Sequence, residues 1–168
     1  MSGLIFLTTN DFHLENGQKG LLLSNKISGF SLILFYSTQC KYCVKFIPSF
    51  RKLPGIISGC QFGMINISKN KDLIKKASRS ITPIEYVPYL ILYSNGKPFM
   101  RYDGQHDMHS IRSFIMDVNN KLKHKRQFSK EANVQNNKKK IPSYTIGNPL
   151  YGVDERSYLE FNEAYTQN

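Results

Sequence analysis

Several features that would assign the chain to a particular class of protein are missing from its sequence. No apolar run approaches the about 20 residues that a transmembrane helix needs. The first nine residues lack the basic region that precedes the apolar core of a secretory signal, so we expect a protein that is not secreted. Only three cysteines occur in 168 residues, which excludes a disulfide framework and favours folding in a reducing compartment.

Acidic residues are also scarce, because 12 of them stand against 23 lysines and arginines, for a formal net charge of +11. The excess is uneven: residues 1–120 carry +7, residues 121–140 carry another +7, and residues 141–168 carry −3. The dense basic segment could contact nucleic acid or an anionic lipid surface. It lacks interleaved aromatic residues, so a solvated linker is the favoured interpretation.

Two of the cysteines, Cys40 and Cys43, stand three residues apart. The apolar run Phe30–Tyr36 before them predicts a buried strand, and the sequence after them, to about Ile57, predicts an amphipathic helix that contains Pro48. Positions i and i+3 on the first turn of a helix share one face, with Cβ atoms about 5–6 Å apart, so a small shift allows a disulfide. The first sulfur then faces the unpaired N–H groups of the helix, which stabilise the thiolate that attacks disulfides.

A chance pair, or half of a zinc site, would also explain this spacing. Zinc usually takes four ligands, and no second paired motif exists. The remaining candidates are Cys60 and four scattered histidines, namely His13, His106, His109 and His124. We therefore expect neither a metal nor an organic cofactor, surface positions for the histidines, and a buried Cys60 that packs as a small apolar residue.

The rest of the chain predicts an α/β fold with a central mixed sheet flanked by helices. Asn95-Gly96, between two strand-like runs, is a strong hairpin signal, and Pro88 opens the first run. Asp107 is a candidate N-cap for a helix over residues 109–123. The other predicted elements are strands at 4–8 and 61–67, a helix at 71–78, a polar turn-rich segment at 10–20 and an apolar element of undetermined type at 21–23.

The composition changes after Lys123, which predicts three parts. A folded domain spans residues 1–123, with its core at 21–123; a basic polar linker spans 124–140; and an aromatic C-terminal arm spans 141–168. The arm carries aromatic residues at spacings unusual for a disordered tail, namely Tyr144, Tyr151, Tyr158, Phe161 and Tyr165. It either folds back on its own domain or docks on another protein.

Over about residues 21–123 this pattern resembles the thioredoxin-like superfamily. The matching positions are Phe35-Tyr36, Cys40-x-x-Cys43, Pro48, Val87-Pro88 and the Asn95-Gly96 hairpin before Gly104. The resemblance implies a thioredoxin-like fold and a thiol–disulfide oxidoreductase that acts on protein cysteines, with Cys40 attacking and Cys43 resolving.

The same resemblance implies a peptide-binding groove beside the two cysteines. Pro88 would be a cis-proline, and the backbone of Val87 would bond to an extended substrate chain. Tyr42 and Tyr89 would flank the cysteine pair, either as an apolar rim around a bound peptide or in a plain packing role.

Three positions depart from the family pattern. The tryptophan before the first cysteine is Gln39 here. The buried acidic residue that helps to deprotonate the resolving cysteine falls at Leu34, and its basic neighbour falls near Met64. Apolar surroundings raise the pKa of a buried thiol, so we expect slow resolution of a mixed disulfide.

A narrower resemblance is to thioredoxin-like virion proteins of large eukaryotic DNA viruses. It is carried by the stretches Tyr86–Tyr89, Gly96–Pro98, Tyr102–Gly104, Pro142–Gly147 and Tyr158–Phe161. The resemblance implies the host cytoplasm or the virion as the location. It also implies an alternative function as a minor capsid or virion-associated structural protein, with the domain as a scaffold and the arm as its docking element.

Overall fold

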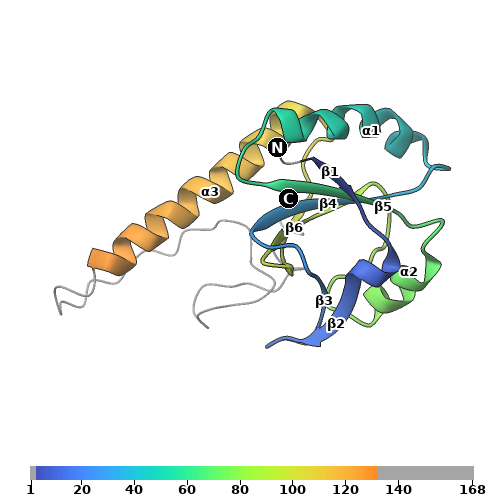
Figure 1. Ribbon diagram of the computed structural model, residues 1–168, viewed down its shortest axis with the longest axis horizontal. Helices are drawn as coiled ribbons and strands as arrows, with labels where there is room; N and C mark the ends of the chain where they lie inside the picture. The colour runs from blue at the N-terminus through green and yellow to red at the C-terminus, as the bar shows by residue number, and fades with distance from the viewer. Residues whose placement is uncertain (1–2, 132–168) are drawn as a thin grey trace, which may run out of the picture.

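The computed structural model describes residues 3–131, with side chains described as far as residue 125. A five-stranded mixed sheet in the order β1-β5-β4-β6-β7 lies at the centre, and a separate hairpin pairs β2 with β3. Helices α1 and α3 cover one face of the sheet, whereas α2 and the β2–β3 hairpin lie on the other (Figure 1). The strands are β1 (Leu4–Phe6), β2 (Phe12–Asn16), β3 (Leu21–Asn25), β4 (Phe30–Tyr36), β5 (Gln61–Asn66), β6 (Tyr89–Ser94) and β7 (Lys97–Tyr102). The helices are α1 (Lys41–Lys52), α2 (Lys71–Ser78) and α3 (Met108–Glu131), with short 3-10 turns at Thr9–Asp11 and Leu53–Gly55.

Side chains of the sheet alternate between two apolar clusters, one on each face. In β4, Leu34 points to the side of α1 and α3, whereas Phe35 points to the side of α2 and the hairpin. A strand that is buried on both faces has a continuous apolar sequence, which is why Phe30–Tyr36 is predictable as a strand. Burying one such side chain stabilises the fold by about 1.5–3 kcal/mol. The cluster on the α1 side includes Phe46 of α1 and packs this helix against the sheet.

The predicted turn at Asn95-Gly96 is confirmed, and it also joins the sheet to the hairpin. Both residues have positive φ, at 50° and 79°, which suits the tight turn between β6 and β7. The carbonyl of Gly96 accepts the N–H of Asn25 at 2.7 Å, at the end of β3. A Cβ at position 96 would collide with the backbone of Asn25, so glycine is required for both the turn and this contact.

The segment predicted to be polar and turn-rich contains a strand. Residues Phe12–Asn16 form β2 and pair antiparallel with β3, which is the apolar element that the sequence left untyped. The ring of Phe12 decides this, because it is 2% exposed and packs against Phe35 and Tyr93 with ring centroids 5.8 and 6.4 Å apart. The turn itself is confirmed at Gly17–Gly20, where the N–H of Gly17 donates to the carbonyl of Gly20.

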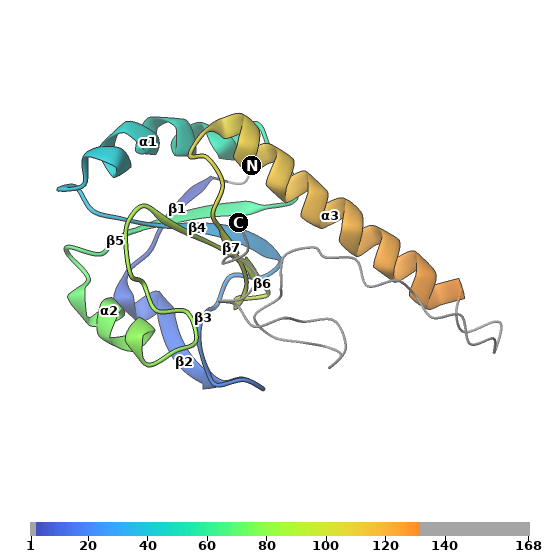
Figure 2. The ribbon, with the colours of Figure 1, turned by 180° about the vertical axis from the view of Figure 1, so that it is seen from behind.

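Two helices end elsewhere than predicted. Helix α1 stops at Lys52 and gives way to a 3-10 turn that contains Pro54, because proline lacks the N–H that an α-helix needs. Helix α3 begins at its predicted N-cap, where the Asp107 carboxylate accepts the N–H of Ser110 at 2.9 Å, but it runs past Lys123 to Glu131. Its last turns project beyond the sheet (Figure 1, Figure 2). The predicted linker therefore begins as helix, and the predicted arm lies outside the described residues.

Tyr93 offers a test of the packing on the hairpin side of the sheet. It is fully buried, and its hydroxyl has no hydrogen-bond partner among the described residues. An unsatisfied buried hydroxyl costs about 1–3 kcal/mol, so Tyr93→Phe is expected to raise the free energy of unfolding by about 1 kcal/mol in urea titrations. The control is Tyr102→Phe, which removes a hydroxyl that donates to the Gln105 carbonyl at 2.7 Å and should lower stability. A loss of stability in Tyr93→Phe would show that the Tyr93 hydroxyl makes a stabilising hydrogen bond.

Candidate functional site

Cys40 occupies the N-cap of α1, so its sulfur lies at the electropositive end of that helix. Its backbone is extended, with φ −87° and ψ 113°, and its Sγ accepts the N–H of Cys43 at 3.2 Å. Side-chain acceptors at an N-cap satisfy an N–H group that the helix leaves unpaired. The predicted placement of both cysteines on the first turn is confirmed, and both are free thiols.

Cys43 is fully buried beneath the helix, in contrast to the half-buried Cys40. Burial raises the pKa of the Cys43 thiol to about 12, and the hydrogen bond with Cys40 and the charge of that sulfur add to the rise. At neutral pH the second thiol is therefore almost entirely protonated, which makes it a poor nucleophile.

The loop before β6 faces the cysteine pair. The peptide bond between Val87 and Pro88 is cis, and the Cys40 Sγ lies 3.6 Å from the Val87 carbonyl oxygen. Val87 is half-buried and Pro88 is buried. Residues 47 positions apart in the chain thus form one site, and the implied cis-proline beside the pair is confirmed.

Two of the three positions that depart from the family pattern in the sequence, Leu34 and Met64, are apolar residues beside the site. Leu34 of β4 and Met64 of β5 are opposite each other in the parallel register, and they are 0% and 1% exposed. Both belong to the cluster on the α1 side, together with Phe46, which lies one turn after Cys43. No charged partner at these positions opposes the effect of burial on Cys43.

Comparison with known proteins decides the family. The family model described as Thioredoxin matches residues 21–117. The chain belongs to the thioredoxin family. The match contains both cysteines and the cis-proline, so the geometry above is that of the thioredoxin-fold site.

Two curated relatives of this thioredoxin-family chain come from invertebrate iridescent viruses. It is 33% identical to "Uncharacterized protein 196R" of Invertebrate iridescent virus 6, over 98% of this chain and 95% of that protein. It is 31% identical to "Uncharacterized protein 020R" of Invertebrate iridescent virus 3, over 97% of this chain and 96% of that protein. The similarity therefore extends past the thioredoxin match into the C-terminal part of the chain.

Solved structures agree on the fold. The Trx4 domain of ERdj5 aligns with a TM-score of 0.52 at 19% identity, covering 70% of this chain and 96% of that one. A single-residue mutant of thioredoxin from Halobacterium salinarum NRC-1 aligns with a TM-score of 0.50 at 18% identity, covering 69% and 90%. The α/β class with a thioredoxin-like sheet is thus confirmed.

The two tyrosines predicted near the cysteine pair of this thioredoxin domain differ in their exposure to solvent. Tyr42 is 76% exposed on the first turn of α1, so its ring is open to a bound chain. Tyr89 is 2% exposed and packs against Phe35, with ring centroids 6.3 Å apart. Strand alternation turns Tyr89 to the face opposite α1, so the structure supports the packing role for Tyr89. Peptide contacts by Tyr42, Val87 and Pro88 stay a prediction.

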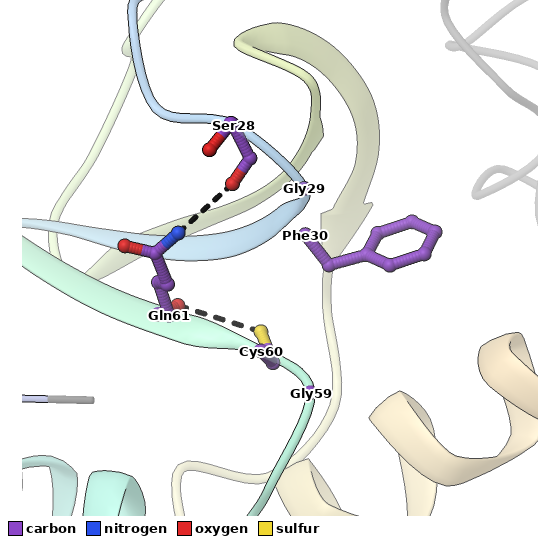
Figure 3. Close-up of a pocket in the computed structure, with 6 residues that line it drawn as sticks. All are labelled: Ser28, Gly29, Phe30, Gly59, Cys60 and Gln61. Atoms are coloured by element: carbon purple, nitrogen blue, oxygen red, sulfur yellow. Dashed lines mark hydrogen bonds between the residues drawn. The ribbon is translucent and has the colours of Figure 1, made fainter. Parts of the chain in front are cut away.

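The third thiol of the chain is a packing residue. Cys60 is 2% exposed, and burial raises its pKa to about 12. It lines a shallow depression of about 250 Å³ just before β5, where its Sγ donates to the Gln61 carbonyl and Gln61 Nε2 donates to the Ser28 carbonyl (Figure 3). Cys60 is buried and protonated and lies apart from Cys40 and the Val87–Pro88 loop, so it fits the packing role expected from the sequence.

Residues 3–131 contain neither a metal-type cluster of side chains nor a membrane-type helix. No three histidine, cysteine, aspartate or glutamate side chains gather there as a metal site would require. His106 is exposed at the surface beside Phe46, with ring centroids 5.2 Å apart, and partial burial lowers its pKa. None of the helices in this part of the chain is long and apolar enough to cross a bilayer.

One group of residues near the site was not predicted from the sequence. Tyr86, Arg101 and Asp103 join the cis-proline loop to the end of β7 through hydrogen bonds. Tyr86 and Asp103 lie 17 residues apart, and this spacing follows no helix or strand period. No signal in the sequence could therefore have found the group.

Proposed function

We propose that this protein is a thiol–disulfide oxidoreductase that acts on protein cysteines through Cys40 and Cys43. The observation that carries the proposal is the position of the Cys40 sulfur. It accepts an N–H at the start of α1 and lies 3.6 Å from the Val87 carbonyl beside the cis-proline. A half-exposed sulfur at a helix N-terminus, next to backbone that can pair with an extended chain, is suited to attack a protein disulfide.

The reaction needs no group beyond the two thiols and the substrate. The Cys40 thiolate attacks one sulfur of the substrate disulfide, so a Cys40–substrate disulfide forms and the other substrate sulfur leaves as a thiolate. The Cys43 thiolate then attacks the Cys40 sulfur, and the second substrate sulfur leaves. The substrate gains two electrons, and the Cys40–Cys43 pair becomes a disulfide. The same steps in reverse oxidise a substrate dithiol.

The substrate chain would lie extended against Val87 and Pro88. Main-chain pairing of this kind accepts many sequences, and pockets for side chains add preference. The exposed ring of Tyr42 would supply the apolar contact on the other side of Cys40. We place this activity in the host cytoplasm or in the virion, in keeping with the iridescent-virus relatives.

A trapping experiment tests the proposal. Cys43→Ser removes the resolving thiol, so Cys40 is expected to remain joined to its substrate, as a product of higher mass on non-reducing gels that disappears with dithiothreitol. Cys40→Ser should form none of it. Cys60→Ser is the matched control, and it should behave as the parent because Cys60 is buried away from the site. Failure of Cys43→Ser to trap any thiol substrate would remove the basis of the proposal.

A second candidate is a virion-associated structural protein that uses the thioredoxin-like domain as a scaffold. The observation that favours it is the apolar Leu34–Met64 pair, since a scaffold does not need rapid release of a mixed disulfide. The viral relatives, which match nearly the whole chain, add support. In this case the cysteine pair would serve as a structural bond or as a relic.

Deletion of residues 132–168 separates the two candidates, because it leaves the described domain and all of α3 intact. An oxidoreductase is expected to keep its disulfide-exchange rate within about twofold, since neither the cysteines nor the loop is touched. A scaffold whose arm docks on capsid proteins is expected to lose incorporation into particles. The paired control is Cys40→Ser in the full chain, which should lose disulfide exchange but keep incorporation into particles.

A further inference from the structure

The loop that carries Val87 and Pro88 is attached to the end of β7 by an ion pair. Arg101 donates from Nε and Nη2 to one carboxylate oxygen of Asp103, at 2.9 and 2.7 Å. The other oxygen of Asp103 accepts the hydroxyl of Tyr86 at 3.0 Å. The side chains of Arg101 and Asp103 are only 15% and 24% exposed, so water screens their attraction less than at an open surface.

This cluster holds the chain on both sides of the cis dipeptide. Tyr86 precedes Val87, and Tyr89 follows Pro88. The rings of Tyr86 and Tyr89 pack edge to face with centroids 5.2 Å apart, and the Arg101 guanidinium lies 5.9 Å from the Tyr89 ring centroid. Since Tyr89 is buried in the sheet, the contacts anchor the loop to the rigid part of the domain.

The bond from Tyr86 to Asp103 persists over the physiological pH range. Burial and the hydrogen bond to Asp103 raise the pKa of Tyr86 to about 12, so its hydroxyl remains a donor. Residues 79–88, between α2 and β6, contain neither helix nor strand, so the ladder bonds that order a sheet do not hold this segment. The strand ladder resumes only at Tyr89, so the side-chain bond from Tyr86 helps to define where the Val87 carbonyl lies.

We propose that Tyr86, Asp103 and Arg101 are positioning residues that hold the Val87 carbonyl beside the Cys40 sulfur, ready to pair with an extended substrate chain. This inference rests on the proposed function, because the pairing matters only if a peptide binds there. A loop that is ordered in advance spares the complex the entropy of ordering it on binding. It also keeps the substrate sulfur in line with Cys40, and a small misplacement of reacting atoms slows a reaction strongly.

The test compares Tyr86→Phe with Tyr93→Phe in the full chain carrying Cys43→Ser, so that only attack by Cys40 is observed. Tyr86→Phe removes the hydroxyl bonded to Asp103, and Tyr93→Phe removes one without a partner among the described residues. Two probes share one coloured leaving group: dithiobis(nitrobenzoate), and a short extended peptide whose cysteine carries the same nitrothiobenzoate. Cys40 attacks the peptide sulfur, a Cys40–peptide disulfide forms, and nitrothiobenzoate leaves with the electron pair.

Tyr86→Phe is expected to slow the reaction with the peptide about tenfold, which corresponds to loss of roughly 1.4 kcal/mol of transition-state stabilisation. The rate with dithiobis(nitrobenzoate), which is too small to pair with Val87, should change less than twofold. Asp103→Ala, which removes both carboxylate oxygens, should behave in the same way, and the double variant should lose no more than the single ones, because all act through one contact. Tyr93→Phe should match the parent with both probes.

A measurement without substrate distinguishes failure of the positioning role from failure of the proposed oxidoreductase function. Amide hydrogen exchange at Tyr86 and Val87 is expected to be faster in Tyr86→Phe than in Tyr93→Phe. Equal slowing with both probes, or unchanged exchange and peptide rates, would overturn the positioning role. If the parent itself fails to react with the peptide, the proposed function fails, and the exchange comparison still decides whether the cluster orders the loop.

Discussion

Release of a substrate from Cys40 is expected to accelerate about tenfold for each unit of pH between roughly pH 6 and pH 10. The physical reason is the Cys43 thiol, whose pKa is raised to about 12 chiefly by burial. Only its thiolate can displace the substrate. The thiolate fraction rises tenfold with each unit of pH below the pKa, so the rate increases in the alkaline direction and has no plateau near neutrality.

The size of the effect at neutral pH follows from the same shift. A thiol with a pKa of about 12 has roughly 3,000-fold less thiolate at pH 7 than one with the ordinary value near 8.5, and the greater nucleophilicity of the more basic thiolate recovers part of this. The net expectation is release about 100-fold slower than from an unperturbed thiol. The hydrogen bond and charge of Cys40 no longer act once Cys40 is joined to substrate, so burial alone remains and about 100-fold is the upper end of the expected slowing.

The measurement is the first-order release of a peptide thiol from a preformed Cys40–peptide disulfide, followed by rapid chemical quench at a series of pH values. Release by added dithiothreitol in the Cys43→Ser variant is the control, since it should follow the thiol of the reagent and not that of Cys43. A release rate that levels off near pH 8 or 9 would contradict the assignment, because it would show an unperturbed resolving thiol.

Replacing Leu34 by aspartate is expected to accelerate release at pH 7 by about 100-fold, the lower end of the roughly 10²- to 10⁴-fold range typical of a general base. Leu34 is fully buried on the α1 side of the sheet, at the position where the family pattern has its acidic residue. A carboxylate there could take the Cys43 proton. The same change is expected to lower the free energy of unfolding by about 3–5 kcal/mol, because it buries an unpaired charge.

The control is Leu34→Asn, which buries a polar group of similar size but cannot accept a proton. It should lose stability without faster release. If Leu34→Asp does not fold, the variant carrying both Leu34→Asp and Met64→Lys supplies a partner charge at the facing position of β5. Equal acceleration by asparagine and aspartate would show that a loosened helix, and not proton transfer, limits release.

Much of the fold can be predicted because short stretches of sequence determine most of its helices and strands. Strand β4 is buried on both faces, so its apolar run is visible in the sequence, and α2 was predicted with its observed ends. Strand β5 was predicted from its alternating pattern as a half-covered strand, whereas the structure buries it on both faces. Strand β2 was missed because its sequence, Phe12–Asn16, is mostly polar. Only the burial of Phe12 between Phe35 and Tyr93, which are far along the chain, reveals its role.

The candidate site likewise has features that the sequence predicts and features that only the tertiary structure shows. The sequence alone determined that Cys40 and Cys43 lie on the first turn of a helix that follows a buried strand, because spacing and hydrophobic pattern act over a few residues. Tertiary structure decided which tyrosine remains open to a substrate, since strand alternation buries Tyr89 and leaves Tyr42 exposed. It alone also brought the Val87 carbonyl to the Cys40 sulfur and bonded Tyr86 to Asp103. Those contacts depend on how strands pair and helices pack, and short-range pattern in a chain carries no information about partners 17 or 47 residues away.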